Sequence, residues 1–121
     1  MRFLSIYKSA ETFVPPSPEE MAKMGKLIEE GMKGGWLVST EGCLPSTNGA
    51  RVRLSGGKLT VTDGPFTESK EVIGGWAILE TDSKAEAVRV ATEFMELHRK
   101  YWPGFDGESE VRPMFDPGVG P

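Results

Sequence analysis

Three charged side chains in a short, turn-forming segment are the strongest chemical signal in this sequence. Asp63, Glu68 and Lys70 share a stretch that begins Asp-Gly-Pro-Phe, which is typical of a rigid turn. A carboxylate held beside an apolar wall such as Phe66 or Trp76 would have a raised pKa and could act as a general acid or base. The segment is therefore a candidate site, with Asp63 and Glu68 catalytic and Lys70, Phe66 and Trp76 contacting the ligand.

The same residue types also have a purely structural interpretation. Asp-Gly-Pro favours a turn, Asp63 or Thr67 can cap a single helical turn, and Glu68 with Lys70 can form a weak surface ion pair. The sequence leaves both interpretations open.

Further ligand-binding candidates lie outside this segment. Arg51 and Arg53 project from one face of a predicted hairpin and could hold a carboxylate or phosphate by charge-assisted hydrogen bonds. Glu41, at the end of a predicted strand, could face the same space. Alternation of charged and apolar residues is equally typical of a half-exposed strand, so solvent is the alternative environment for these side chains.

The remaining reactive residue types give little chemistry. The chain has one histidine and one cysteine, too few for a histidine- or cysteine-rich metal site. His98 falls in the last turn of a predicted helix, where the helix dipole favours a positive group. Cys43 lies in a predicted loop without a histidine nearby in sequence. The glycine pairs lack the pattern of a phosphate-binding loop. We therefore predict no metal and no cofactor.

Composition limits the class of protein. The chain has 121 residues, of which 38% are hydrophobic, enough for one packed core. We expect one domain over residues 1–115 and a flexible tail over residues 116–121. The net charge of −4 and the scattered basic residues argue against a nucleic-acid partner. No apolar run approaches the roughly 20 residues that span a bilayer, and the N-terminus does not resemble a signal peptide, so we expect a cytoplasmic protein.

Turn residues separate short apolar segments along the chain. Two capping-box patterns, Ser17-Pro18-Glu19-Glu20 and Ser83-Lys84-Ala85-Glu86, predict two helices, which end before Gly34 and near Lys100. Their apolar stripes are predicted to contain Met21, Met24, Ile28 and Met32 in the first helix, and Ala85, Val88, Ala91 and Met95 in the second. The predicted strands cover residues 3–8, 36–40, 51–55, 58–62, 74–79 and 110–112.

The hairpin has the clearest local signal. Gly56-Gly57 suits the positive φ angles of a tight two-residue turn. That turn places Leu54 opposite Leu59 and Val52 opposite Val61 on one face.

This order of elements predicts an α+β domain of ferredoxin-like topology, a split β-α-β arrangement with two helices on one face of an antiparallel sheet. The other face then needs cover. Apolar side chains such as Phe3, Trp36 or Trp76 would favour packing against a second copy, so we expect a homodimer.

One set of motifs resembles a known family. The segment Asp63 to Glu71 followed by Gly74-Gly75-Trp76 resembles the DGPF branch of the YCII-related proteins, and the resemblance extends to Gly42, Gly56-Gly57 and Val111-Arg112-Pro113. It implies a dimeric α/β-barrel-like assembly in which two sheets face each other. A histidine and aspartate pair has been proposed for YCII relatives, with the histidine in the first helix. The first predicted helix here holds no histidine, so that pair does not carry over.

Three functions remain compatible with the sequence. The leading one is a homodimeric small-molecule binding or regulatory module whose ligand occupies the space between the facing sheets. The alternative is a small cofactor-independent isomerase, lyase or oxygenase acting on a carbonyl, aromatic or lactone-like metabolite. Asp63 or Glu68 would be its acid or base, and Lys70 or Arg51 would stabilise negative charge. The third is a protein that only docks on another protein.

Overall fold

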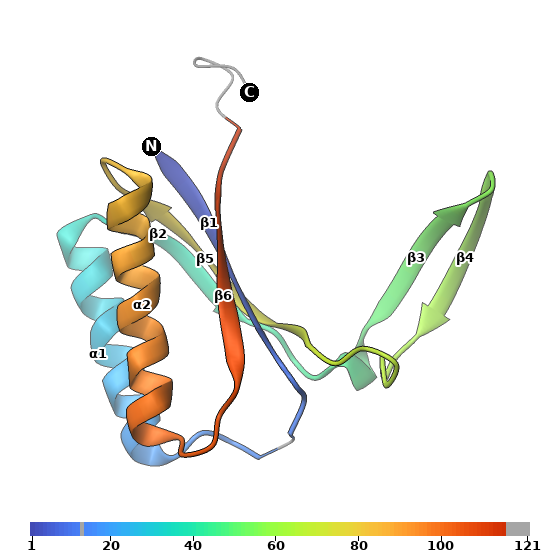
Figure 1. Cartoon of the computed structure of the whole chain (residues 1–121), viewed down its shortest axis with the longest axis horizontal. Helices are drawn as coiled ribbons and strands as arrows, with labels where there is room; N and C mark the ends of the chain where they lie inside the picture. The colour runs from blue at the N-terminus through green and yellow to red at the C-terminus, as the bar shows by residue number, and fades with distance from the viewer. Residues whose placement is uncertain (13, 116–121) are drawn as a thin grey trace.

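The computed structural model describes residues 1–12 and 14–115 (Figure 1). The predicted tail, residues 116–121, lies outside the described residues. All the predicted strands and helices are present, most of them one or two residues longer than expected. The elements are β1 (Arg2–Ser9), α1 (Pro18–Gly34), β2 (Leu37–Gly42), the short 3-10 helix η1 (Ser46–Asn48), β3 (Ala50–Ser55), β4 (Lys58–Asp63), β5 (Val72–Glu80), α2 (Lys84–Tyr101) and β6 (Gly107–Pro113).

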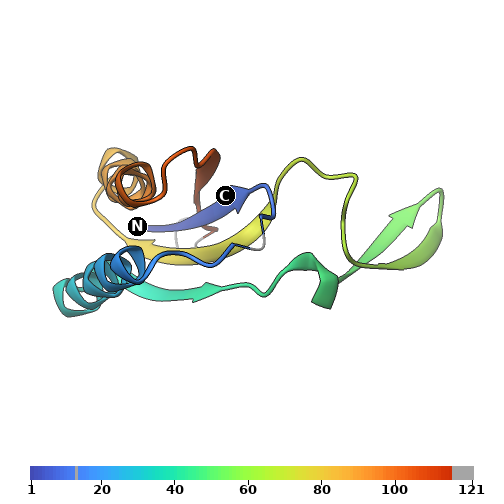
Figure 2. The same cartoon turned by 90° about the horizontal axis from the view of Figure 1, so that it is seen from below.

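Four strands form one antiparallel sheet in the order β2-β5-β1-β6. With the β3-β4 hairpin set aside, the chain runs strand, helix, strand, strand, helix, strand, which is compatible with the predicted ferredoxin-like topology. Both helices lie on the same side of the sheet, and the views in Figures 1 and 2 agree on this. The fold is therefore α+β with a mainly antiparallel sheet.

The core lies between the sheet and the helices. Phe3 is fully buried and pairs with Leu79 in the sheet, and both pack with Leu37, Ala87 and Val90. Side chains alternate between the faces of a strand, so the neighbouring pairs Leu4 with Ile78 and Ile6 with Trp76 point to the opposite face. Phe3 thus belongs to the helix-covered core, contrary to the expectation that it favours a second copy.

The predicted helical stripes are confirmed only in part: Ile28 packs against the core and Met24 is half-buried, but other members of the stripes are exposed. In α1 the buried residues are Glu20, Leu27 and Gly31, whereas Met21 and Met32 are exposed. The helix approaches β2 closely at Gly31, where an added Cβ would lie 2.7 Å from the Leu37 Cβ. A close contact of this kind favours a small residue such as Gly31 at the buried position.

In the second helix, too, the buried residues differ from the predicted apolar stripe. Ala87, Val90, Ala91 and His98 are buried in α2, and Val88 is exposed. Of the predicted stripe, only Ala91 is buried. Among the described residues, no helix is long and apolar enough to cross a membrane.

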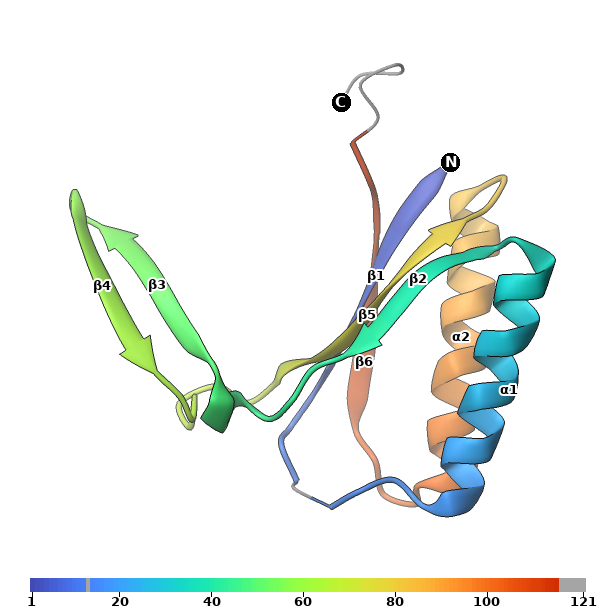
Figure 3. The ribbon, with the colours of Figure 1, turned by 180° about the vertical axis from the view of Figure 1, so that it is seen from behind.

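The hairpin β3-β4 projects away from the rest of the molecule, and we call residues 50–63 the arm (Figure 3). Its predicted register is confirmed: Leu54 pairs with Leu59 and Val52 with Val61. The turn glycines, Gly56 and Gly57, have φ angles of 57° and 78°, which glycine adopts without steric cost. The predicted single helical turn after the arm is absent, and a turn closed by a hydrogen bond from Ser69 N to Phe66 O stands in its place.

Candidate functional site

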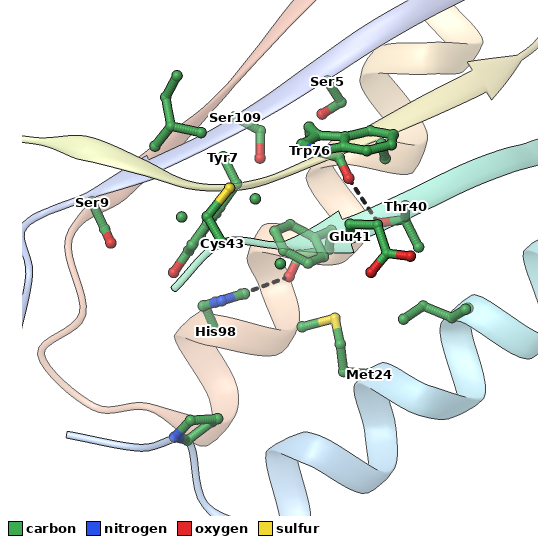
Figure 4. A pocket seen from close by; sticks show the side chains of 18 of the residues that line it. Ser5, Tyr7, Ser9, Met24, Thr40, Glu41, Cys43, Trp76, His98 and Ser109 are labelled. Carbon is green, nitrogen blue, oxygen red and sulfur yellow. Dashed lines mark hydrogen bonds between the residues drawn. The ribbon is translucent and has the colours of Figure 1, made fainter. Parts of the chain in front are cut away.

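A cavity of about 780 Å³ lies at one end of the sheet, beneath the helices (Figure 4). The first turn of α1 and the last turn of α2 meet there because the two helices run in opposite directions. Apolar side chains from both helices, including Met24, Leu27 and Phe94, contribute to its lining. Ser5, Tyr7 and Ser9 alternate along β1 on the side that faces the helices, and they add three hydroxyl groups.

The most unusual group in this lining is the carboxylate of Glu20. The residue is only 2% exposed, and neither carboxylate oxygen has a hydrogen-bond partner among the described residues. Its backbone N–H donates to Ser17 Oγ at 3.1 Å, as the capping pattern predicts. The side chain does not bond back to the cap, however, and turns into the protein. A buried carboxylate without donors is costly, so an external donor would bind there favourably.

His98, whose ring is also buried, is an ionisable group next to Glu20. His98 Nδ1 lies 3.1 Å from the Phe94 carbonyl oxygen, an arrangement in which Nδ1–H donates to that carbonyl. His98 Nε2 lies 3.5 Å from Glu20 Oε1. On a neutral ring, Nε2 would present a lone pair to the carboxylate, so the pair is favourable only with one more proton, on Nε2 or on the carboxyl group.

Helix dipoles favour the charged form of this pair. Glu20 lies in the first turn of α1, where the unpaired backbone N–H groups attract an anion. His98 lies in the last turn of α2, where the carbonyl groups attract a cation. Burial acts in the opposite direction because it disfavours both charges. The two groups therefore lie at helix ends whose dipoles suit their charges, in buried surroundings that disfavour charge.

Aromatic rings surround the histidine. The centroids of Phe94, Phe105, Tyr7 and Trp102 lie 4.7, 4.8, 5.1 and 6.4 Å from that of His98. In Figure 4 the Tyr7 side chain extends from β1 toward His98 on α2. Burial raises the pKa of the Tyr7 phenol, and the nearby Glu20 carboxylate raises it further. Tyr7 is thus a neutral hydroxyl beside the Glu20–His98 pair.

The predicted site at the turn is divided by the structure. Arg51 forms an ion pair with Glu68, donates to Ser69 Oγ at 2.8 Å, and stacks over the Phe66 ring with its guanidinium carbon 3.9 Å from the centroid. Arg51, Glu68 and Phe66 therefore come together at the base of the arm. A backbone N–H of Glu68 itself, followed by Arg51, lowers the pKa of the Glu68 carboxyl. That direction is opposite to the one expected of a desolvated acid or base.

The other predicted site residues are spread out. Asp63 and Lys70 are exposed on either side of this turn, and Arg53 is exposed on the arm. Glu41 and Trp76 pair in the sheet and border the cavity, but alternation places the Trp76 side chain on the face opposite the helices; the Thr40 hydroxyl donates to the Trp76 carbonyl at 2.8 Å. Cys43 is exposed and also lines the cavity. The structure therefore separates the arm-base cluster from the cavity.

Sequence reasoning missed Glu20 and His98 as site residues because each already had a local explanation. Glu20 fitted the capping box and His98 fitted the helix dipole. A signal was nevertheless present in the spacing. His98 follows Phe94 by four residues and Ala91 by seven, so the three share one helical face. Glu20, Leu27 and Gly31 share a face of the first helix in the same way.

Comparisons with known proteins match most of the chain. The family model of the YCII-related domain matches residues 1–95. The chain belongs to the YCII-related domain family. An uncharacterized protein of Rhizobium meliloti (strain 1021), R00369, is 32% identical over 100 residues, which cover 81% of this chain and 77% of the relative. In this YCII-related chain, the match includes β1, α1 and most of α2, and therefore Tyr7 and Glu20, but it ends before His98.

The described part of this YCII-related chain contains no group of three or more His, Cys, Asp or Glu side chains placed to hold a metal ion. The chemistry that its own residues offer at the cavity is hydrogen bonding and proton transfer. Glu20 accepts, His98 holds or releases a proton, and Tyr7 can donate or accept.

Proposed function

We propose that this protein is a small-molecule binding module that takes an apolar or aromatic ligand with an O–H or N–H donor into the cavity. The observation that carries the proposal is the buried Glu20 carboxylate without donors at the wall of a cavity of about 780 Å³. That volume falls within the range of roughly 300–1,000 Å³ that small-molecule sites occupy. A ligand donor at Glu20 would remove the cost of the unpaired carboxylate, so part of the binding energy comes from the protein's own unsatisfied group.

The lining favours phenols over carboxylic acids. Aromatic rings around His98 offer stacking and edge contacts to a planar ligand. A phenol hydroxyl can donate to Glu20, whereas a benzoate would bring a second negative charge next to it. We therefore expect phenol and catechol to bind more tightly than benzoate.

Isothermal titration calorimetry with phenol, catechol and benzoate tests this directly. Loss of a hydrogen bond to a charged group is expected to weaken catechol binding by about 10- to 100-fold in Glu20→Gln. Glu68→Gln is the matched control, because it makes the same change at the arm base and should leave the affinity unchanged. Affinity lost in Glu68→Gln but kept in Glu20→Gln would move the site to the predicted turn with Asp63 and Lys70. Absence of binding by all three compounds would count against the phenol class.

A catalytic function is the second candidate, favoured by the distance of 3.5 Å between Glu20 Oε1 and His98 Nε2. A carboxyl group and an imidazole at this distance can remove a proton from a ligand and return it, as an isomerase or lyase requires. Proton NMR in D₂O would follow exchange of the C–H protons next to the carbonyl of acetophenone. Exchange accelerated by the wild type and lost in Glu20→Gln would support an enzyme. If exchange is equally fast with and without protein, the protein does not catalyse proton transfer on acetophenone and can at most bind it.

We also propose that two chains associate through the open face of the four-stranded sheet. Support comes from the pairs Leu4 with Ile78 and Ile6 with Trp76, which lie on the face opposite the helices and are only partly buried. Packing two such faces would form the dimeric α/β barrel that the family resemblance implies. The space between the two packed sheets stays a second predicted ligand site. That site requires two chains, whereas the cavity at Glu20 is formed by one chain.

A further inference from the structure

The arm presents an apolar stripe that nothing in the described chain covers. Val52, Leu54, Leu59 and Val61 are 71, 69, 67 and 68% exposed. The register places all four on the same face of the hairpin, because Val52 pairs with Val61 and Leu54 with Leu59. Single exposed apolar residues are ordinary on a protein surface, but a contiguous group on one face marks an interaction surface.

The arm is held firmly at its base. Gly64 N donates to Gly49 O at 2.9 Å and closes the hairpin where it leaves the domain. The Ser46 backbone lies so close to Gly64 that a Cβ there would collide with it, so no other residue fits. Arg51 adds the ion pair with Glu68 and the hydrogen bond to Ser69. A hairpin of two strands is only marginally stable alone in water. The contacts at the base therefore keep the arm folded, and its apolar stripe stays available for a partner.

The arm and the helices lie on opposite sides of the four-stranded sheet (Figures 1 and 3). Each arm strand has six residues. At about 3.3 Å per residue, such a strand reaches roughly 20 Å, about twice the spacing of about 10 Å between two packed sheets. If a second sheet packs on the open face, the arm is long enough to reach past it and contact the second chain from the side.

Charge also favours a second copy as the occupant. The arm contains Arg51, Arg53, Lys58 and Asp63, a net charge of +2, of which the Arg51 charge is paired with Glu68 at the base. The whole chain has a formal net charge of −4, so the part outside the arm carries −6. A basic arm is therefore attracted to the acidic body of another copy.

We propose that the arm clasps a second copy of this chain, with its apolar stripe packed on the partner and the two arms related by a twofold axis. The clasp rests on the face-to-face association proposed above, and it adds a specific surface to it. The stripe offers on the order of 200–300 Å² of apolar surface per arm. This area follows from the transfer free energy of a Val or Leu side chain, divided by about 25 cal/mol per Å² and scaled by the exposed fraction of each side chain. Two arms would then supply about a third of a standard interface of roughly 1,600 Å².

Light scattering across a dilution series of the full chain tests the clasp. Val52→Thr, Leu54→Gln, Leu59→Gln and Val61→Thr are combined in one variant, which removes the apolar stripe. Thr60→Gln with Thr62→Gln is the matched control, because these exposed residues lie on the opposite face of the same strand. The wild type should be a dimer, the stripe variant should have a dimer dissociation constant raised by about 100-fold or more, and the control should resemble the wild type. Far-UV circular dichroism checks that each variant folds.

Each negative result contradicts a different part of the proposal. A dimer that is equally strong in the stripe variant and the wild type overturns the clasp alone, and dissociation by Leu4→Gln with Ile78→Gln would then keep the face-to-face dimer. A wild type that stays monomeric overturns both the clasp and the dimer, while ligand binding at Glu20 is measured separately. Hydrogen exchange of residues 50–63 that slows only when a different protein is added would assign the arm to that partner and overturn the clasp.

Discussion

Replacing Glu20 by methionine is expected to stabilise the ligand-free protein. The carboxylate is buried, its oxygens have no hydrogen-bond donor, and the nearest His98 nitrogen is 3.5 Å away, beyond a normal hydrogen bond. Methionine has a similar length and keeps the cavity wall apolar. Removing an unsatisfied buried polar group recovers about 1–3 kcal/mol of unfolding free energy. For a chain of this size, the melting temperature should rise by roughly 3–5 °C per kcal/mol.

The matched control is Glu19→Met, one residue earlier in the same helical turn. Glu19 is exposed, so its replacement removes a negative charge from the helix N-terminus without changing buried contacts. That loss should cost about 0.3–1 kcal/mol. The difference between the two variants therefore isolates the effect of burial, and urea unfolding followed by circular dichroism measures it at neutral pH.

A result in the other direction would refute the reasoning. If Glu20→Met lowered the free energy of unfolding by more than Glu19→Met, the carboxylate would be a net stabilising partner of His98 in the folded state. Glu20 would then not be an unsatisfied group held ready for a ligand. If Glu20→Met is more stable and also loses catechol binding, the residue trades stability for function, as groups in binding sites often do.

Two further predictions concern packing and charge. Gly31→Ala should lower the unfolding free energy by about 1–3 kcal/mol, because its Cβ would lie 2.7 Å from the Leu37 Cβ. Gly25→Ala, in the same helix with nothing within 4 Å, should raise it by up to about 1 kcal/mol, and equal effects in urea unfolding would refute the close approach. The Lys8 ammonium, 2.7 Å from Glu110, lowers the pKa of the Glu110 carboxyl. This stabilisation is present above the ordinary glutamate pKa and is lost as pH falls through the lowered value, so Lys8→Gln should make the loss of stability between about pH 6 and pH 3 shallower. An unchanged slope would contradict it.

Local patterns in the sequence were sufficient to predict the elements and their order. Ser17 and Ser83 cap the two helices as expected, since a hydroxyl three residues before a free backbone N–H needs no tertiary contact to act. The Gly56-Gly57 turn fixed the register of the arm for the same reason, because two residues with positive φ determine which side chains face each other. The order of elements, with only two helices, then predicted a sheet with one covered and one open face.

Only the tertiary structure decided which faces of the helices are buried and therefore where the cavity lies. Glu20 and His98 are 78 positions apart in sequence, and each has a plausible surface role when considered alone. The antiparallel helices bring the start of one beside the end of the other, and that contact buries both side chains. The exposure of the arm was also decided by the tertiary structure. Its apolar stripe was predicted, but nothing local in the sequence reveals that the domain's own core forms without the arm residues. Long-range packing sets burial, and burial turns ordinary charged and apolar residues into a site or an interface.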